Sequence, residues 1–509
     1  MSGSDPLLVG LDVGTTNIKA IVFDLHGRVA AEASARTPTH HPRPGWAFYR
    51  PDELWDQTLA TLRQAVARTP DPRRIVSVAV ASIGETGFPL DEAGNALYDG
   101  LAWFDNRTEP QAGQIEATVG ADAAFAIIGL PVSSIFGLCK MLWLKQNEPD
   151  VYARARTWLN TADYIAYRLC RVPATDRSLA SRTLALNLDR LAWDEDLIRA
   201  VEVDPALFAP LTPSGTPLGP LDADVAAAAG LPASVTVAVG GHDHIVGAMA
   251  LGINQPGTLL DSMGTAEALF MPLSRPVTDP AAGRQGYEMG AHVSGGYYAI
   301  PSYRTAGACI EWFRDTCAPQ VDFATLDAEA ITVGPGAAGV RFLPHLRLPH
   351  SPHNDPKSRG AFIGLSTDVT RGALYRAVLE GLVFEMRATL DPLFAYDGVP
   401  PIQQIYAIGG VTRNRLLMQI KATLMEQTIY VAELADATAL GAALLGGVGA
   451  GVYRDIADAA AHVDAPVTSV EPIAAWSELY AGIYRDVYQP LCAALQPINH
   501  ANYPYKYRE

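Results

Sequence analysis

The chain has 509 residues, of which 49% are hydrophobic and 18% are charged. This composition excludes disorder, collagen and coiled coil as descriptions of the whole chain, and the length favours two large domains. Lysine and arginine total 38, against 54 aspartates and glutamates, which gives a net charge of −16. Because an acidic surface without a Lys/Arg run repels phosphate backbones and anionic lipids, we expect no nucleic acid and no membrane as a partner.

The five cysteines are widely spaced and form no CxxC pair. This pattern predicts reduced thiols rather than a disulfide framework or a zinc ribbon. The first ten residues, MSGSDPLLVG, lack the basic and long apolar segments of a signal peptide. The longest apolar stretches, 225–241 and 437–453, are too short or too rich in Gly and Pro to predict a membrane span. We expect a cytoplasmic protein.

Both halves of the chain alternate apolar β-branched runs with amphipathic stretches, which indicates an α/β fold. The predicted strands are 7–12, 19–24, 29–35, 75–83 and 235–240 in the first half, and 257–261, 266–270, 297–300 and 405–409 in the second. The predicted helices are 53–68, 138–146, 162–169, 371–390, 416–425 and 437–446. The glycine-rich run 446–451 differs from GxGxxG and predicts close helix packing.

Each half opens with an aspartate shortly before a Gly-Thr turn. Asp12 precedes Gly14, and Asp261 precedes Gly264, each time in a strand–turn–strand context. The recurrence predicts two domains of similar plan, whose hairpins can grip one polyphosphate from opposite sides. The alternative is the chance recurrence of a short glycine turn.

The segment from Asp12 to Lys19, DVGTTNIK, is a candidate phosphate site. A Gly-Thr-Thr turn presents backbone N–H groups and two hydroxyls, all of which can donate to phosphate oxygens. Asp12 at the end of its strand can hold Mg²⁺ directly or through water, because this ion prefers a few carboxylates and several waters. The alternative is an ordinary hairpin turn.

Asp243 follows a buried strand in the segment Gly240 to His244, GGHDH. Open α/β sheets bind ligands at such carboxyl ends, and paired glycines allow close approach to the backbone. A carboxylate there can accept the proton of an attacking hydroxyl during phosphoryl transfer. The alternatives are a metal site formed by His242 and His244, for which no third ligand is apparent, and a polar loop.

Two further segments suit a polyhydroxylated ligand. Glu85 and Thr86 follow another buried strand, and the segment Trp103 to Arg107, WFDNR, combines an aromatic ring with a carboxylate and a guanidinium. A ring packs against C–H faces, and charged groups bind hydroxyls. A surface turn with one salt bridge is the alternative.

A loop rich in proline holds His345, His350 and His353. Its spacing fits no metal-binding pattern, so a metal site and a plain loop stay open as alternatives. The chain has no Walker A motif and no HRD/DFG pair, so any phosphoryl transfer would follow neither the P-loop nor the protein-kinase scheme.

In their order and spacing these segments resemble the FGGY family of carbohydrate kinases, which shares the actin and hexokinase type of ATPase fold. The resemblance runs nearly end to end. It rests on DVGTTNIK at 12–19, PGW at 44–46, WFDNRT at 103–108, KMLWLKQNEP at 140–149, TDRSLASRT at 175–183, GGHDH at 240–244, SMGTAEA at 262–268, RGAFIGLS at 359–366, RAVLEGLVFEMR at 376–387, IGGVTRNRLLMQI at 408–420 and ATALGAALLGG at 437–447.

The resemblance implies a role for each matching residue. Asp243 matches the catalytic base, and Asp12 matches the Mg²⁺-associated carboxylate. The positions that the resemblance assigns to ATP are Gly14, Thr15, Thr16, Asn17, Lys19, Gly264, Thr265, Gly307, Gly409, Gly410 and Asn414. The positions on the sugar side are Glu85, Thr86, Trp103, Asp105, Arg107 and His244.

Departures from the family pattern fall mainly on the sugar side. Gly84 stands where glycerol kinase carries Arg, which argues against glycerol as the acceptor. The residues 47–49 (AFY) and 345–348 (HLRL) also differ from many relatives, and His242 and His244 flank Asp243 where smaller or amide residues are frequent. These differences leave the ATP positions intact and the acceptor open.

Together with the α/β pattern, the resemblance implies two actin-like (ribonuclease H-like) domains around a deep cleft. Residues 1–247 would hold the sugar and the first phosphate loop, and residues 248–509 would hold the nucleotide. We expect an ATP- and Mg²⁺-dependent kinase of a small ketose, such as a pentulose or deoxyketohexose. A linear polyol is the alternative acceptor. A nucleotide-driven conformational switch and an inactive sugar-sensing protein are the alternatives of other classes. The resemblance also makes a homodimer possible, although this sequence contains no recognisable interface pattern.

Overall fold

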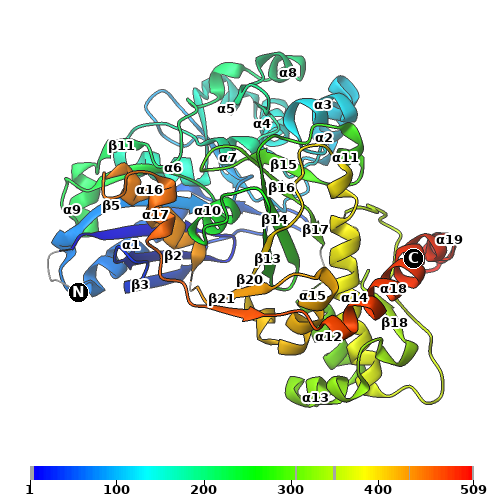
Figure 1. The fold of residues 1–509 in the computed structure, drawn as a ribbon. Coiled ribbons are helices and arrows are strands. Elements are labelled where there is room, and N and C mark those ends of the chain that lie inside the picture. Colours follow the sequence, from blue (N-terminus) through cyan, green and yellow to red (C-terminus); the bar gives the residue numbers. More distant parts are fainter. Residues whose placement is uncertain (1–4, 304–305, 348–350, 435, 507–509) are drawn as a thin grey trace.

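The computed structural model describes residues 5–303, 306–347, 351–434 and 436–506. It contains two large β-sheets with helices packed against them (Figure 1). The first sheet has the order β11 (Pro217–Pro220), β12 (Thr236–His242), β5 (Ile75–Ser82), β1 (Leu7–Val13), β2 (Asn17–Phe23) and β3 (Val29–Arg36). The second has the order β15 (Glu288–Ala291), β16 (Tyr297–Ile300), β14 (Glu267–Leu273), β13 (Thr258–Met263), β20 (Gln404–Ile408), β21 (Ile429–Ala432) and β22 (Val467–Val470), with β17 (Ser302–Tyr303) beside β14.

The two sheets share one plan of strand pairing. β1 pairs antiparallel with β2 and parallel with β5, and β13 pairs antiparallel with β14 and parallel with β20. The next strand outward is parallel in both sheets, β12 beside β5 and β21 beside β20. An antiparallel strand closes this edge each time, as β11 and β22. The predicted repetition of one domain plan is therefore present in the structure.

The aspartates that open the two hairpins are not equivalent, contrary to the sequence comparison. Asp12 lies two residues before Gly14, whereas Asp261 lies three residues before Gly264. Because side chains alternate between the faces of a strand, this difference of one residue turns Asp261 to the opposite face. Asp261 is fully buried there and forms an ion pair with Lys421, which also binds Glu267 at 2.9 Å.

The helices of the first half pack around the first sheet and in a group beside it. They are α1 (Pro51–Arg68), α2 (Glu109–Val119), α3 (Ala121–Ile128), α4 (Gly137–Asn147), α5 (Pro149–Arg154), α6 (Thr161–Cys170), α7 (Arg177–Ser181), α8 (Glu195–Ala200), α9 (Ala223–Ala229) and α10 (Asp243–Ala250). Short strand pairs join the connecting loops: β4 (Phe48–Tyr49) with β7 (Gly100–Leu101), β6 (Gly87–Leu90) with β8 (Thr157–Asn160), and β9 (Leu186–Asn187) with β10 (Ala192–Trp193).

The second half adds a further set of helices. They are α11 (Pro280–Arg284), α12 (Gly307–Cys317), α13 (Phe323–Val333), α14 (Arg371–Leu390), α15 (Arg415–Met425), α16 (Ala437–Gly449), α17 (Ile456–Ala461), α18 (Ala474–Ile483) and α19 (Gln489–Lys506). A hairpin of β18 (Arg341–Leu343) and β19 (Ala361–Ile363) lies against α14.

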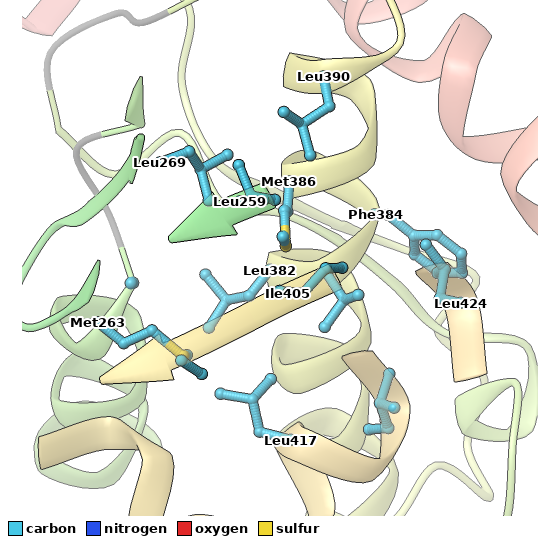
Figure 2. Close-up of a cluster of buried hydrophobic side chains, with 14 of the residues drawn as sticks. Leu259, Met263, Leu269, Leu382, Phe384, Met386, Leu390, Ile405, Leu417 and Leu424 are labelled. Carbon is cyan, nitrogen blue, oxygen red and sulfur yellow. The ribbon is translucent and has the colours of Figure 1, made fainter. Parts of the chain in front are cut away.

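The core of the second domain forms between its sheet and α14. Figure 2 shows Leu382, Met386 and Leu390 of this helix among side chains of β13 and β20, with Leu259 and Ile405 from those strands. All five side chains are inaccessible to solvent. The apolar spacing predicted a helix over 371–390, and α14 has these bounds.

Helix α16 comes from the second half of the chain but packs on the first sheet, against β1, β5, β12 and α10 (Figure 1). Glycines make this approach possible. A Cβ on Gly10 would overlap the carbonyl of Ala439, and a Cβ on Gly446 would lie 2.9 Å from Ser77 Oγ. The predicted close packing of this glycine-rich helix is confirmed.

All five cysteines carry free thiols, as their spacing predicted. Among the described residues, no helix is both long enough and apolar enough to cross a membrane.

Candidate active site

Two carboxylates meet where β1 ends and α10 begins. Asp12 is the penultimate residue of β1, and Asp243 is the first residue of α10. The pKa of Asp12 is raised to about 7, first by burial and next by the negative charge of Asp243, while Lys19 opposes the shift. The side chains that the sequence assigned separately to a metal and to a base therefore share one poorly solvated space.

A third carboxylate, Asp436, joins this cluster from the second half of the chain. It forms an ion pair with Lys19 across 417 positions of sequence, and its charge also raises the pKa of Asp12. Asp436 directly precedes α16, which packs on the first sheet. Sequence reasoning missed this residue, although an acidic residue just before a predicted helix was visible.

The surroundings of Asp243 favour an oriented carboxylate. Its Oδ1 accepts the backbone N–H of His244 at 2.6 Å and lies 3.3 Å from Nε2 of His242. Burial raises the pKa of Asp243, the charge of Glu85 raises it too, and His244 and Arg182 lower it. Burial holds the pKa of His242 well below its usual range, so this ring is neutral.

Both histidines converge on Asp243 rather than on a third ligand. His244 is exposed, with Nε2 4.0 Å from Oδ1 of Asp243. In the part of the chain that the structure describes, no group of three or more His, Cys, Asp or Glu side chains is arranged to hold a metal ion. A metal site built on His242 and His244 receives no support from this geometry.

The first Gly-Thr turn is a defined loop beside Asp12. Gly14 donates its N–H to the carbonyl of Asn17 at 3.1 Å, and Thr37 donates its hydroxyl to the carbonyl of Gly14 at 2.7 Å. Thr16 is exposed, and Thr15 is half-buried. The turn thus keeps its shape through backbone bonds and presents two threonines.

Trp103 connects this turn with the predicted sugar side. Its indole N–H donates to Oγ1 of Thr15 at 3.0 Å, and 36% of the residue is exposed. Its ring meets that of Phe104 edge-on. One hydrogen bond therefore joins two segments that the sequence placed at separate ligands.

Asp105 and Arg107 form an ion pair with two hydrogen bonds. Arg107 donates from Nε and Nη2 to the two oxygens of Asp105, at 2.9 and 2.7 Å, and its guanidinium lies 3.7 Å from the ring centroid of Trp46. Asp105 also accepts the N–H of Ala47 at 2.6 Å. Both side chains are buried, so in this structure they fix the loop that carries Trp103.

Glu85 and Thr86 differ in what they offer a ligand. The buried hydroxyl of Thr86 donates to the carbonyl of Leu101 at 3.0 Å. The buried Lys140 donates to the carbonyls of Glu85 and Leu101 at 2.7 and 3.0 Å, and burial lowers the pKa of this lysine to about 8. The carboxylate of Glu85 binds Arg182 at 2.7 Å. Sequence reasoning assigned no role to either cation, although Lys140 and Arg182 both lie in segments that carry the family resemblance, 140–149 and 175–183.

The predicted nucleotide positions of the second domain line a cavity of about 490 Å³. Those that border it are Gly264, Thr265, Gly307, Gly410 and Asn414. The other lining residues are Met263, Ile310, Glu311, Phe323, Asp327, Tyr375, Val411 and Arg413. A mixed wall of aromatic, apolar and polar groups beside a Gly-Thr turn suits a nucleoside with a phosphate chain.

Glycines and one asparagine shape this cavity. A Cβ on Gly307 would lie 2.6 Å from the carbonyl oxygen of Gly264. Gly409 has a φ of 102° and borders a neighbouring groove rather than this cavity. Asn414 caps α15 by accepting the N–H of Leu417 at 2.8 Å, and it donates to Asp327 at 2.8 Å.

The histidine-rich loop is not part of either centre. His345 is buried, with Nδ1 2.6 Å from Oγ of Ser358 and Nε2 3.0 Å from Oε1 of Glu385. The ring of His353 lies 6.1 Å from that of His345, and His350 falls outside the described residues. These contacts attach the loop to α14 within the second domain.

Comparison with known proteins agrees with this geometry. The model of the FGGY family of carbohydrate kinases, N-terminal domain, matches residues 7–250, and that of the C-terminal domain matches residues 259–450. A glycerol kinase of Ralstonia pickettii (strain 12J) is 30% identical over 470 residues, with 89% of this chain and 91% of that protein covered. A xylulose kinase of Bacillus subtilis (strain 168) is 28% identical over 497 residues, with 97% and 98% covered.

The crystal structure of xylulose kinase from Rhodospirillum rubrum is 29% identical and superposes with a TM-score of 0.89, covering 97% of this chain and all of that one. These relatives confirm the predicted two-domain actin-like fold and an enzyme that transfers a phosphoryl group, with ATP binding as a family property. The chain belongs to the FGGY family of carbohydrate kinases.

Proposed function

We propose that the protein transfers the γ-phosphoryl group of ATP to a hydroxyl of a small ketose, with Asp243 as the general base. The observation that carries this proposal is the pair Asp12 and Asp243 in one poorly solvated cluster, beside a Gly-Thr turn and beside Glu85. The relatives named above act on xylulose and on glycerol, so a linear polyol is the second candidate acceptor.

Asp243 would accept the proton of the attacking hydroxyl. Because burial raises its pKa, its carboxylate is a stronger base than that of an exposed aspartate. A loose phosphoryl-transfer transition state demands little base strength. The bond from the backbone N–H of His244 and the neighbouring ring of His242 hold the carboxylate in one orientation.

Asp12 would hold Mg²⁺, directly or through water. Asp12 suits this ion, because Mg²⁺ needs only one or two carboxylates beside water and phosphate oxygens, and the negative charges of Asp243 and Asp436 both act on Asp12. A divalent cation would remove the repulsion that raises the pKa of Asp12, and it would neutralise charge on the phosphates. Lys19 is positioned for a phosphate by Asp436.

The nucleotide would lie between the two Gly-Thr turns. The cavity beside Gly264, Gly307 and Gly410 would hold the nucleoside, and the phosphates would point toward Gly14 and Thr15. Backbone N–H groups and threonine hydroxyls of the turns would then stabilise charge on the γ-phosphoryl oxygens. The acceptor would bind against Trp103 and Glu85.

The first experiment is ADP release measured in a coupled assay with Mg-ATP over a panel of ketoses, aldoses and polyols. We expect a strong acceptor-dependent rate that Asp243→Asn abolishes, while equilibrium dialysis shows unchanged ATP binding. Asp464→Asn serves as the matched control, because Asp464 is an exposed aspartate paired with Arg28.

Equal activity of Asp243→Asn and the wild type would remove Asp243 from the role of base. Slow ATP hydrolysis that no acceptor accelerates would favour the conformational switch, and sugar binding without hydrolysis would favour the sensor. The expected homodimer and the division of the chain at residue 247 are predictions as well. Sedimentation velocity tests the first, and limited proteolysis of the full chain tests the second.

A further inference from the structure

A buried arginine joins the two domains beside Asp243. Arg182 follows α7 and donates from Nε to Oε1 of Glu85 at 2.7 Å, and its Nη2 also lies 2.7 Å from that oxygen. Its Nη1 donates to Oε2 of Glu288, also at 2.7 Å. Glu85 lies just beyond β5 of the first sheet, whereas Glu288 begins β15 of the second. The guanidinium therefore bridges one carboxylate of each domain.

The backbone is adapted to this arginine. A Cβ on Gly84 would lie 2.7 Å from Cγ of Arg182 and 2.8 Å from Cδ2 of His242. A glycine at this position leaves the space that both side chains fill. Arg182 also lowers the pKa of Asp243, which places its charge close to the proposed base.

Hydrogen bonds at the contact between the domains hold Glu288 in this position. Ala291 donates its N–H to Oγ of Ser181, the residue before Arg182, at 2.9 Å. Met289 donates its N–H to the carbonyl of Gly129 at 2.8 Å. β15 is thus fastened to the first domain at the same place where Glu288 meets Arg182.

Each carboxylate keeps one oxygen for a ligand. Among the described residues, no hydrogen bond reaches Oε2 of Glu85 or Oε1 of Glu288. The side chain of Glu288 is 28% exposed, so a ligand can reach it from solvent. Carboxylate oxygens accept hydroxyl donors, and one guanidinium between two carboxylates leaves a net negative charge that repels anions.

We propose that Glu288 is an acceptor-binding residue contributed by the second domain, and that Arg182 positions it together with Glu85. The acceptor is then a neutral, polyhydroxylated molecule that reaches from Asp243 past Glu85 to Glu288. Glu85 receives a hydroxyl near the reacting one, and Glu288 receives a distal hydroxyl. This assignment rests on the proposed kinase function and narrows its substrate class.

The test compares Glu288→Gln with the wild type across acceptors of increasing length, from glycerol to five-carbon polyols and ketoses. Because one charged hydrogen bond is lost, we expect KM for five-carbon acceptors to rise roughly tenfold or more. KM for glycerol, kcat and KM for ATP should stay unchanged. The variant should also use gluconate better than the wild type does, since a repelling charge is gone; a merely structural role of Glu288 would not produce that gain.

Two further variants complete the design. Arg182→Lys keeps the positive charge but cannot reach both carboxylates, so it should raise KM for long acceptors and also for glycerol, because Glu85 loses its partner together with Glu288. Glu195→Gln removes the exposed partner of Arg199 and should leave KM unchanged for every acceptor. If Glu288→Gln left KM unchanged for every five-carbon acceptor, or raised KM for glycerol equally, the assignment of Glu288 would be overturned.

The failure of the proposed function has a different signature. In that case the wild type itself shows no acceptor-dependent turnover. Calorimetric titration of the wild type and Glu288→Gln with five-carbon polyols then still decides the assignment, because equal affinities would refute it and a selective loss in the variant would support it.

Discussion

At the scale of single residues, the hydrogen bond from Trp103 to Thr15 is the contact with the clearest consequence. Oγ1 of Thr15 accepts the indole N–H, and the hydroxyl of Thr15 can donate its own proton either to Tyr49 or to a bound ligand. A phosphate oxygen near the first turn is such an acceptor under the proposed function. Trp103 would then orient a phosphate donor while its exposed ring meets the sugar.

Trp103→Phe keeps an aromatic ring and removes the N–H. We expect KM for ATP to rise about three- to tenfold, as for the loss of one hydrogen bond, with KM for the acceptor less affected. Thr15→Val should cause a similar change, and the double variant should be no worse than either single one. Phe104→Leu alters the neighbouring exposed ring and should leave KM for ATP unchanged. Additive effects in this cycle would contradict a shared role.

Lys140 offers a test by pH. Burial lowers its pKa to about 8, so the folded protein releases this proton at a lower pH than the unfolded chain does. Well below pH 8 the folded and the unfolded chain both hold this proton, and the contribution of Lys140 to the free energy of unfolding is at its minimum. Between pH 8 and the unfolded value near 10.5 this contribution rises with pH. Relative to Lys140→Met, the wild type should gain about 2 kcal/mol between pH 7 and 9.5.

Urea denaturation at the two pH values measures this difference. Lys145→Met is the control, because Lys145 lies on the same helix with a third of its side chain exposed. Parallel pH profiles of the wild type and Lys140→Met would show that Lys140 titrates normally. Lys140→Met should also weaken acceptor binding, since the ammonium group holds the carbonyls of Glu85 and Leu101.

At the scale of elements, the turn after β20 contains two adjacent glycines with different steric requirements. Gly409 has a φ of 102°, and a Cβ there would overlap the carbonyl of Met263; Gly410 has no atom within 4 Å of such a Cβ. Only Gly409 is therefore required by the backbone. Gly410 borders the nucleotide cavity, so a methyl group at this position could affect nucleotide binding without affecting the backbone.

Gly409→Ala should lower the free energy of unfolding by about 1–3 kcal/mol, the range expected for a strained backbone with a steric overlap. Gly410→Ala should leave that free energy unchanged. Chemical denaturation of both variants provides the comparison, and ATP titration shows whether Gly410→Ala affects nucleotide binding alone. Equal stability of the two variants would refute the difference between these positions.

At the scale of the whole molecule, α16 fastens the second half of the chain to the first. A Cβ on Gly441 would overlap the carbonyl of Val246 in α10. We expect Gly441→Ala to destabilise the protein by about 1–3 kcal/mol, because two tightly packed helices must separate. Gly113→Ala is the matched control in exposed helix α2, where nothing lies within 4 Å of the new methyl group.

The control variant should change the stability of the protein in the opposite direction. Alanine in an exposed helix interior is better by about 0.5–1 kcal/mol than glycine, so Gly113→Ala should stabilise. Thermal unfolding of both variants separates helix propensity from helix packing. A stabilised Gly441→Ala would show that α16 and α10 tolerate a wider spacing.

Local pattern was enough to predict much of this protein. Apolar spacing predicted α14 with its bounds, and the order of the motifs predicted the FGGY family that the comparisons confirm. The C-terminal helices α18 and α19 were not predicted, since prolines interrupt the pattern of α19. Tertiary bonds hold this region, among them that from Tyr488 to Glu385 at 2.6 Å.

The sequence by itself determined most strands of the two sheets, though not β11, β15, β17, β21 and β22. It also determined helix α14, the two Gly-Thr turns and the family, because periodicity and turn chemistry are properties of neighbouring residues. Tertiary structure alone decided which distant charges meet. Arg182 and Glu288 are 106 positions apart, and Lys19 and Asp436 are 417 apart. The pairing of Asp261 with Lys421, which are 160 positions apart, was likewise visible only in the fold. Such contacts depend on strand order, register and helix crossing, which no local pattern specifies.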